Sequence, residues 1–324
     1  MFSRVFCQSI LSASILFLSS SSADCTPVSE AKALIEICTD SQRAVLVSPF
    51  DASGRTDWHY VPRDRTGFPL AEMNEVQKER LWSLLRTALS ETGLEKVQAV
   101  IRLEQVLLDL EKSPNRDPGK YYLSIWGEPS PSNRWGWRFE GHHTSVNVTL
   151  EGEETISVTP TFFGANPATL GTGEDQGFRA LSAQEDRARE FMLSLPKEQR
   201  EKAIVAGDLT DVESGGQPQI EPKIVSGLAC SELSQDDRGL LEETLESYSE
   251  WFLPEIAEKL GLASQSLVND PDLIVRWIGG LGEGDELHTY RISGKSFDIQ
   301  YANNQSAANH VHTLVRSIGH DFGQ

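Results

Sequence analysis

Apolar residues recur with a helical period over the first third of the chain. Leu81, Leu84, Leu85 and Ala88 follow the i, i+3, i+4, i+7 spacing of an amphipathic helix, and the neighbouring segments repeat that spacing. A cluster of turn-forming residues at 113–120 then ends this part of the chain. The spacing predicts helices over 27–47, 71–91 and 94–111.

Beyond that cluster, apolar and polar residues alternate with the period of two that is typical of half-buried strands. Helical spacing returns in two later segments, the first broken at Pro196 and the second kinked at Pro254. We therefore predict strands over 121–126, 135–150, 154–162, 272–279, 286–292, 296–302 and 310–316, and helices over 182–205 and 234–261. No internal repeat is evident from the sequence. Short connections favour one large α+β domain, with helices packed against a mostly antiparallel sheet.

The acidic composition narrows the range of partners. The chain has 29 Lys and Arg against 48 Asp and Glu, which gives a formal net charge of −19. Such a surface repels phosphate backbones and anionic lipid, so nucleic acid is not an expected partner. We expect a small-molecule substrate or ligand, and the sequence leaves the oligomeric state open.

The N-terminus has the order of a secretory signal. Arg4 precedes the apolar run Ile10–Leu18, and Ser21, Ser22 and Ala23 then supply the small residues of a cleavage site. The apolar run is about half of the roughly 20 residues that a membrane-spanning helix needs. We predict a signal peptide at 1–23, a mature domain at 24–324, and a secreted or periplasmic protein without a membrane anchor after cleavage.

Three cysteines follow the predicted signal, and they allow two interpretations. Cys25 and Cys38 flank one short segment and can close a disulfide loop, which leaves Cys230 free. The alternative is three reduced, buried thiols.

Histidines gather in two blocks about 170 residues apart, and these blocks carry the candidate chemistry. The candidate metal ligands are His142 and His143 in the first block and His310 and His312 in the second. A His-x-His pair on one strand points both imidazoles to the same side, as a metal site requires. We expect strand 135–149 to lie beside 310–316, so that the histidines face one cleft.

Adjacent histidines on a strand point to opposite faces, so at most one of His142 and His143 is expected to bind the metal. Alternation places Arg138, Glu140 and His142 on one face. A hydrogen-bonded histidine cluster without metal, or metal-free acid–base chemistry, remains an alternative.

Three strings resemble the signature blocks of one family. They are WGWRFEGHHTSVNVT (135–149), TPTFFGANPA (159–168) and the tail from Tyr290 to Gly323. In these blocks the sequence resembles the domain of unknown function family DUF3500, over nearly all of the predicted mature chain. The resemblance implies that the Trp-Arg-Phe-Glu-Gly-His-His and Asn-His-x-His motifs belong together, with His288 as a further member of the cluster. It implies no activity.

These observations favour a secreted metalloenzyme. His142, His310 and His312 would hold a divalent metal such as Zn²⁺, Fe²⁺ or Cu²⁺. Glu140 would be a ligand or a general base, and Arg138 would orient an anionic substrate group. Hydrolysis of a small polar or anionic substrate is the first hypothesis. The alternatives are a copper- or iron-dependent oxidoreductase and a non-catalytic secreted protein that binds a ligand or metal.

Overall fold

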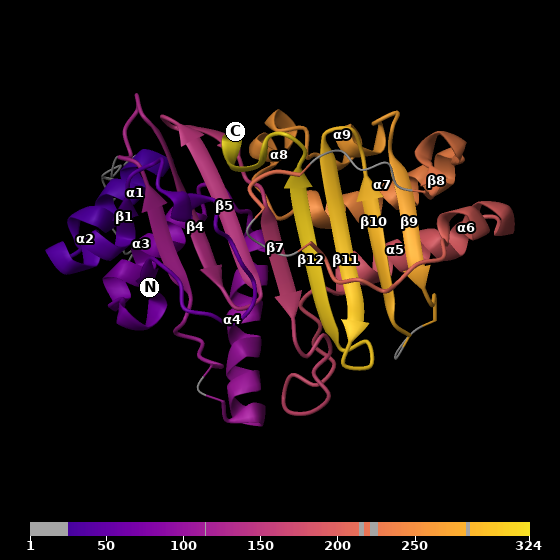
Figure 1. The fold of residues 1–324 in the computed structure, drawn as a ribbon, viewed down its shortest axis with the longest axis horizontal. Coiled ribbons are helices and arrows are strands. Elements are labelled where there is room, and N and C mark those ends of the chain that lie inside the picture. The colour runs from indigo at the N-terminus through magenta and orange to yellow at the C-terminus, as the bar shows by residue number, and fades with distance from the viewer. Residues whose placement is uncertain (1–24, 114, 214–216, 221–225, 283–285) are drawn as a thin grey trace, which may run out of the picture.

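The computed structural model describes residues 25–113, 115–213, 217–220, 226–282 and 286–324. Within these residues the strands form one 12-stranded sheet in the order β1-β3-β4-β5-β7-β12-β11-β10-β9-β8, with β2 on β3 and β6 on β5. Every pairing except that of β1 with β3 is antiparallel. Figure 1 shows this sheet with its strands side by side. The predicted single α+β domain with a mostly antiparallel sheet is confirmed.

The strands are β1 (Val47–Ser48), β2 (Phe68–Pro69), β3 (Tyr122–Trp126), β4 (Arg134–Gly141), β5 (Thr144–Glu151), β6 (Glu154–Ser157), β7 (Thr161–Ala165), β8 (Leu228–Ala229), β9 (Ile274–Gly279), β10 (His288–Ser293), β11 (Phe297–Gln305) and β12 (His310–Ser317). The α-helices are α1 (Pro27–Glu36), α2 (Asp40–Leu46), α3 (Glu75–Leu85), α4 (Glu91–Glu111), α5 (Ser182–Ser194), α6 (Lys197–Ala203), α7 (Gln235–Ser249), α8 (Pro254–Lys259) and α9 (Ser264–Val268). Short 3₁₀ helices are η1 (Ser53–Arg55), η2 (Leu70–Glu72), η3 (Cys230–Glu232) and η4 (Asp321–Gly323).

Two predicted boundaries differ in ways that matter. The single strand predicted over 135–150 is a hairpin, because the chain turns at His142 and His143 between β4 and β5. The helix predicted over 27–47 is two helices, since Thr39 caps the start of α2.

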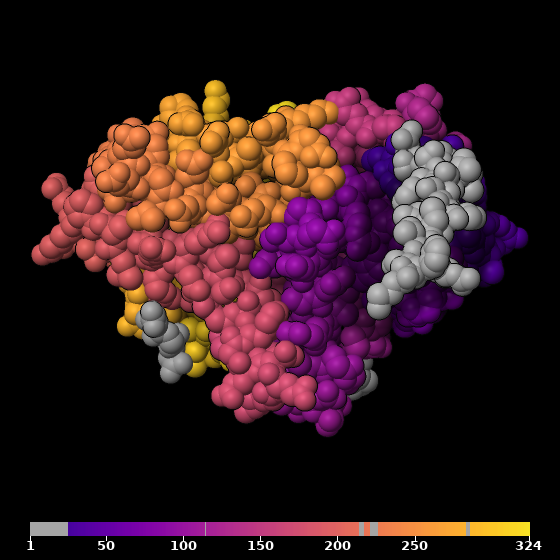
Figure 2. All heavy atoms as spheres, turned by 180° about the vertical axis from the view of Figure 1, so that it is seen from behind, coloured from indigo at the N-terminus to yellow at the C-terminus, as the bar shows by residue number. Residues whose placement is uncertain are grey.

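The main core lies between the sheet and the helices. Trp135, Trp137 and Phe139 alternate along β4 and are fully buried on this face, opposite helix residues such as Leu81 and Leu85. Seen from behind, the helices hide almost all of the sheet (Figure 2). We call this side the helix face.

The opposite side of the sheet, the loop face, carries polar residues and is covered by irregular segments. Residues 49–67 and 204–213 lie over it, and Trp58, Tyr60 and Val212 form a second small core with sheet residues such as Phe162. Charged side chains are buried beneath these segments, among them Arg138 and Glu140. A buried charge must be paired, so this face depends on ion pairs where the helix face depends on apolar packing.

The two halves of the chain repeat one arrangement. Both begin with two helices, a parallel contact to a strand (β1 with β3, and Ile204 with Trp277), a short edge strand, a 3₁₀ turn and a helix. Different helices follow, α4 in the first half and α8 and α9 in the second, and then come four corresponding strands, with β6 as an additional short strand in the first half. The correspondence joins α1 to α5, α2 to α6, β2 to β8, η2 to η3, α3 to α7, and β3, β4, β5 and β7 to β9, β10, β11 and β12. β7 and β12 then pair antiparallel at the centre, which gives an approximate two-fold axis.

Strand register supports the repeat residue by residue. Arg138 lies opposite Ser124 and Asn147, and Arg291 lies in the corresponding place opposite Arg276 and Gln300. The expectation of no internal repeat is therefore wrong for the fold. Most corresponding positions carry different residue types, so the sequence pattern did not show it.

The predicted signal peptide lies outside the described residues. Within the part that the structure describes, no helix is long and apolar enough to cross a membrane. Cys25, Cys38 and Cys230 are all free, Cys25 exposed and the other two buried. The interpretation as free thiols holds, although Cys25 is not buried.

Candidate metal centre

Three imidazoles converge at one end of the central strands of the sheet. The Nε2 atom of His143 lies 3.0 Å from that of His310 and 3.2 Å from that of His312. A metal held tetrahedrally by nitrogens at roughly 2.0–2.1 Å would set these atoms about 3.3 Å apart. The group His143, His310 and His312, which we call the histidine triad, can therefore hold a metal ion.

The triad is assembled from both halves of the chain. His143 lies in the β4–β5 turn with a φ of 61°, and its backbone N–H donates to the Tyr60 carbonyl at 3.0 Å. His310 and His312 lie on β12, which β7 joins to β5. β7 thus spaces the two histidine blocks. The expectation that strand 135–149 lies directly beside 310–316 is therefore wrong, because β7 lies between β5 and β12. The two histidine blocks still meet, at the β4–β5 turn.

Gly164 on β7 makes the close approach possible. A Cβ atom at this position would lie 3.0 Å from Cδ2 of both His143 and His312. A side chain here would require both rings to shift by a few tenths of an ångström. The glycine of the TPTFFGANPA block therefore allows the two imidazoles to pack this closely against β7.

Asp211 fixes the orientation of His312. The Nδ1 atom of His312 donates to the Asp211 carboxylate at 2.7 Å, which leaves Nε2 unprotonated and directed into the triad. Burial alone would raise the pKa of Asp211, but the hydrogen bond and charge of His312 outweigh it and hold this pKa below its usual value. The pair has the carboxylate–histidine arrangement that supports metal ligands in proteins.

Two of the triad imidazoles, those of His143 and His310, have lowered pKa values, which favours the neutral form that a metal ligand needs. Burial, reinforced by repulsion from the neighbouring histidines, lowers the pKa of His143 well below its usual value. Burial and the nearby His312 lower the pKa of His310 to about 4. His310 is partly exposed, so the triad can be reached from solvent on its side.

His142 lies next to the triad without joining it. Its Nδ1 atom is 2.5 Å from the Glu104 carboxylate, its ring nitrogens are 3.1 and 3.2 Å from Arg116, and its ring stacks on that of His143 at 3.7 Å. The structure thus brings His143, and not His142, to the His310–His312 pair. The turn at 142–143 is the reason, because strand alternation does not continue through it.

Glu140 and Arg138, the predicted catalytic residues, lie within buried ion pairs of the loop face. The Glu140 carboxylate accepts from Arg65 at 2.7 Å and from the His59 backbone at 2.9 Å, with Arg138 at 3.3 Å. Arg138 also donates to the carbonyls of Gly54 and Arg55. These contacts attach the covering segment to the sheet, which is a structural task.

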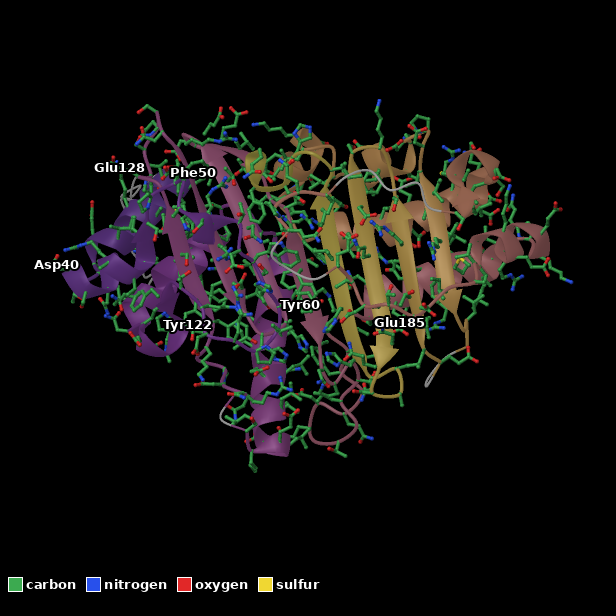
Figure 3. All side chains as sticks on the ribbon, viewed as in Figure 1. Asp40, Phe50, Tyr60, Tyr122, Glu128 and Glu185 are labelled. Atoms are coloured by element: carbon green, nitrogen blue, oxygen red, sulfur yellow. The ribbon has the colours of Figure 1, made fainter. Side chains whose placement is uncertain are left out.

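His288, the further candidate, belongs to the helix face. Its ring stacks between Trp277 and Tyr301, with centroid distances of 4.8 and 5.6 Å. Its Nε2 atom lies 3.7 Å from Glu185 of α5, a residue labelled in Figure 3. It is not part of the triad.

Residues outside the recognised blocks complete the surroundings. Tyr60, which is labelled in Figure 3, stacks on Phe162 of β7 with a centroid distance of 4.1 Å. Its ring centroid lies 5.0 Å from that of His312. Tyr60 and Asp211 come from the two covering segments, whose irregular sequence gives no periodic signal. A cavity of about 180 Å³ lies beside His142 and Glu104, with a polar lining that includes Arg63, Arg65, Asp117 and Lys120.

The structure is thus that of an α+β protein with a group of three histidines that could hold a metal ion. The chain belongs to the family described as "Protein of unknown function (DUF3500)", whose model matches residues 22–324. No curated protein and no solved structure matches the chain.

Proposed function

We propose that the protein is an exported, metal-dependent hydrolase that acts on a small polar or anionic substrate. The observation that carries this proposal is the convergence of three imidazole nitrogens, on rings of which one is held by a carboxylate. Three protein ligands leave a coordination position for water or substrate, as in catalytic zinc sites.

The donor set fits Zn²⁺, and it also suits Fe²⁺ and Cu²⁺ because it contains no thiolate. When bound, the metal would supply Lewis acidity and lower the pKa of a coordinated water. His143, His310 and His312 would hold it, and Asp211 would keep His312 in the required tautomer.

The Glu104–His142 pair is suited to moving the proton that hydrolysis releases. It packs directly on His143 and lines the polar cavity. Glu140 cannot take this role while Arg65 and Arg138 hold its carboxylate. Arg138 is held in the same ion pair, so Arg63, which lines the cavity and is partly exposed, replaces it as the arginine that would face a substrate.

A non-catalytic metal-binding protein is the second candidate. The position of Glu140 favours this second candidate. Glu140 was the predicted general base, but it lies within ion pairs and not beside the triad, so it could not act on a metal-bound water. An oxidoreductase is a third outcome if the purified protein holds copper or iron.

Metal analysis of the purified full chain tests the proposal. We expect about one metal ion per chain, with metal lost from His310→Ala and His312→Ala. His320→Ala is the matched control, since His320 is exposed and outside the triad. Wild type without metal, or His312→Ala with full metal, would contradict the metal site.

Turnover then separates enzyme from binder. On ester, peptide and phosphate panels, Glu104→Gln should keep the metal and lower turnover by roughly 10²–10⁴-fold, the usual size of a general acid–base contribution. Stoichiometric metal with no turnover on any panel favours the binding protein, and turnover of phenols with bound copper favours the oxidoreductase.

Export is tested separately. N-terminal sequencing of material recovered outside the cytoplasm should begin at Asp24. Exported protein that still begins at Met1 would contradict the predicted cleavage after Ala23.

A further inference from the structure

A second cavity lies on the loop face of the second half of the chain. It has a volume of about 110 Å³, and Arg276, Thr289, Arg291 and Gln300 of the sheet form its floor. Thr210, Asp211 and Val212 form one wall. Asp211 therefore separates this cavity from the histidine triad, which it contacts on its other side.

Two arginines lie side by side on the floor of this cavity. Arg276 on β9 is the direct cross-strand partner of Arg291 on β10, so their side chains share a face. Like charges in this position normally destabilise a sheet. A shared anion would remove that repulsion.

The carboxylates near these two arginines pair with Arg291 and not with Arg276. The Arg291 Nε atom is 2.6 Å from Asp298, and its NH2 atom is 3.7 Å from Glu213. Arg276 makes no ion pair or hydrogen bond with another residue that the structure describes. Asp298 also accepts from Ser293 and Gln300, so its charge is already met by three donors.

The corresponding position in the first half of the chain has one arginine in place of two, and backbone carbonyls accept hydrogen bonds from its guanidinium. Arg138 corresponds to Arg291, but opposite Arg138 stands Ser124, which donates to the Thr66 carbonyl at 3.1 Å. The carbonyls of Gly54 and Arg55 accept from the Arg138 guanidinium. The second half has an arginine in place of that serine and a cavity above it.

We propose that the cavity between Arg276 and Arg291 binds a small oxyanion: a phosphate or sulfate ion, or the carboxylate of a small molecule. Two guanidinium groups offer the planar, charge-assisted donors that such anions prefer. The volume suits an ion of phosphate size better than a larger organic molecule. This site does not depend on the proposed hydrolase activity.

Calorimetric titration of the full chain with sodium phosphate tests the proposal. We expect saturable binding by the wild type, weaker at high salt, and an affinity at least about tenfold lower for Arg276→Gln. Arg276 holds no described neighbour in place, so the variant should fold. Without phosphate its melting temperature should equal or exceed that of the wild type, and phosphate should raise the melting temperature of the wild type alone.

Three controls make the result decisive. Arg86→Gln removes an exposed arginine elsewhere and should bind phosphate like the wild type. His310→Ala should also keep binding, because the triad is a different site. Acetate that competes with phosphate supports a carboxylate ligand, and acetate that does not compete supports phosphate or sulfate.

The proposal is overturned if the wild type shows no saturable binding or if Arg276→Gln binds as well as the wild type. Loss of binding in His310→Ala but not in Arg276→Gln would place phosphate at the triad and would also overturn it.

Discussion

The two halves of the sheet solve the same electrostatic problem with the acid on different strands. In the first half Glu140 on β4 lies opposite Ser145 on β5 and pairs with Arg138. In the second half the order is reversed, with Ser293 on β10 opposite Asp298 on β11, and Asp298 pairs with Arg291. What the repeat keeps is the register and the arginine, while the carboxylate moves to the facing strand. Both halves therefore keep one carboxylate and one serine at this cross-strand pair, although the two residues have exchanged strands.

The halves differ most at the two ends of the central β7–β12 pair. At one end lie His143, His310 and His312. The repeat places Ser296, Ile156 and Val158 at the other end, where the C-terminal η4 packs with its Phe322 N–H donating to the Thr159 carbonyl. One end therefore carries the histidine triad, and at the other end the C-terminal segment is hydrogen-bonded to the sheet.

The buried carboxylates give the strongest test of this comparison. Glu140→Gln should lower the free energy of unfolding by about 3–5 kcal/mol, because it leaves Arg65 and Arg138 buried without their full counter-charge. Asp298→Asn should cost less, since Arg291 is 19% exposed. Urea unfolding measures both, and metal content should stay unchanged. Equal costs, or loss of metal in Glu140→Gln, would contradict the structural role.

Gly164 tests the end that carries the triad. Gly164→Ala should lower metal affinity at least about tenfold and destabilise the fold by about 1–3 kcal/mol, because the new methyl group meets both imidazoles. Gly239→Ala is the control, as nothing lies within 4 Å of its added Cβ on α7. That control should be as stable as the wild type or more so. Full metal affinity in Gly164→Ala would show that the rings are placed differently.

The pH dependence of the metal-free protein tests the same end with a smaller effect. The pKa of His310 is lowered to about 4 in the fold against about 6.5 when unfolded. A lowered histidine pKa means that stability is complete above pH 6.5 and is lost as the pH falls towards 4, because only the unfolded chain takes up the proton. Between pH 7 and 5 this one group should cost about 2 kcal/mol. Urea unfolding in EDTA should show the loss, and His310→Ala should reduce it. A stability independent of pH in this range would contradict the lowered pKa of His310.

Helix caps provide the smallest test, since they compare equivalent positions directly. Asn74 caps α3 by accepting from the Gln77 N–H, and Ser234 caps α7 by accepting from the Asp237 N–H. Asn74→Ala and Ser234→Ala should each lower stability by about 1 kcal/mol. Thermal unfolding would reveal a large difference between them, and such a difference would show that the halves are less alike than their strand registers.

The sequence predicted the fold class and the meeting of the two histidine blocks, because strand alternation and local helix spacing depend only on nearby residues. It did not predict the turn at His142 and His143. Neither residue is a usual turn former, and the alternation of 135–149 continues past them into β5. The choice between the two histidines depended on that turn.

Other contacts of the site could not be predicted from the spacing of apolar residues, because they join segments that are far apart in the sequence. Asp211 and Tyr60 reach the triad from irregular segments whose positions are set by tertiary packing alone. The ion pair of Glu140 with Arg65 joins residues 75 positions apart. The repeat is not evident in the sequence because most corresponding residues differ between the halves; Arg138 and Arg291 are among the few that are identical.

The division of the triad between the halves also fixes when a metal can be acquired. His143 is made early, but His310 and His312 lie within the last fifteen residues of the chain. During synthesis no partial chain shorter than this contains the site, and the β7–β12 pairing must form before the three imidazoles meet. A metal ion held by all three imidazoles would therefore require that both halves have been made and joined through β7 and β12.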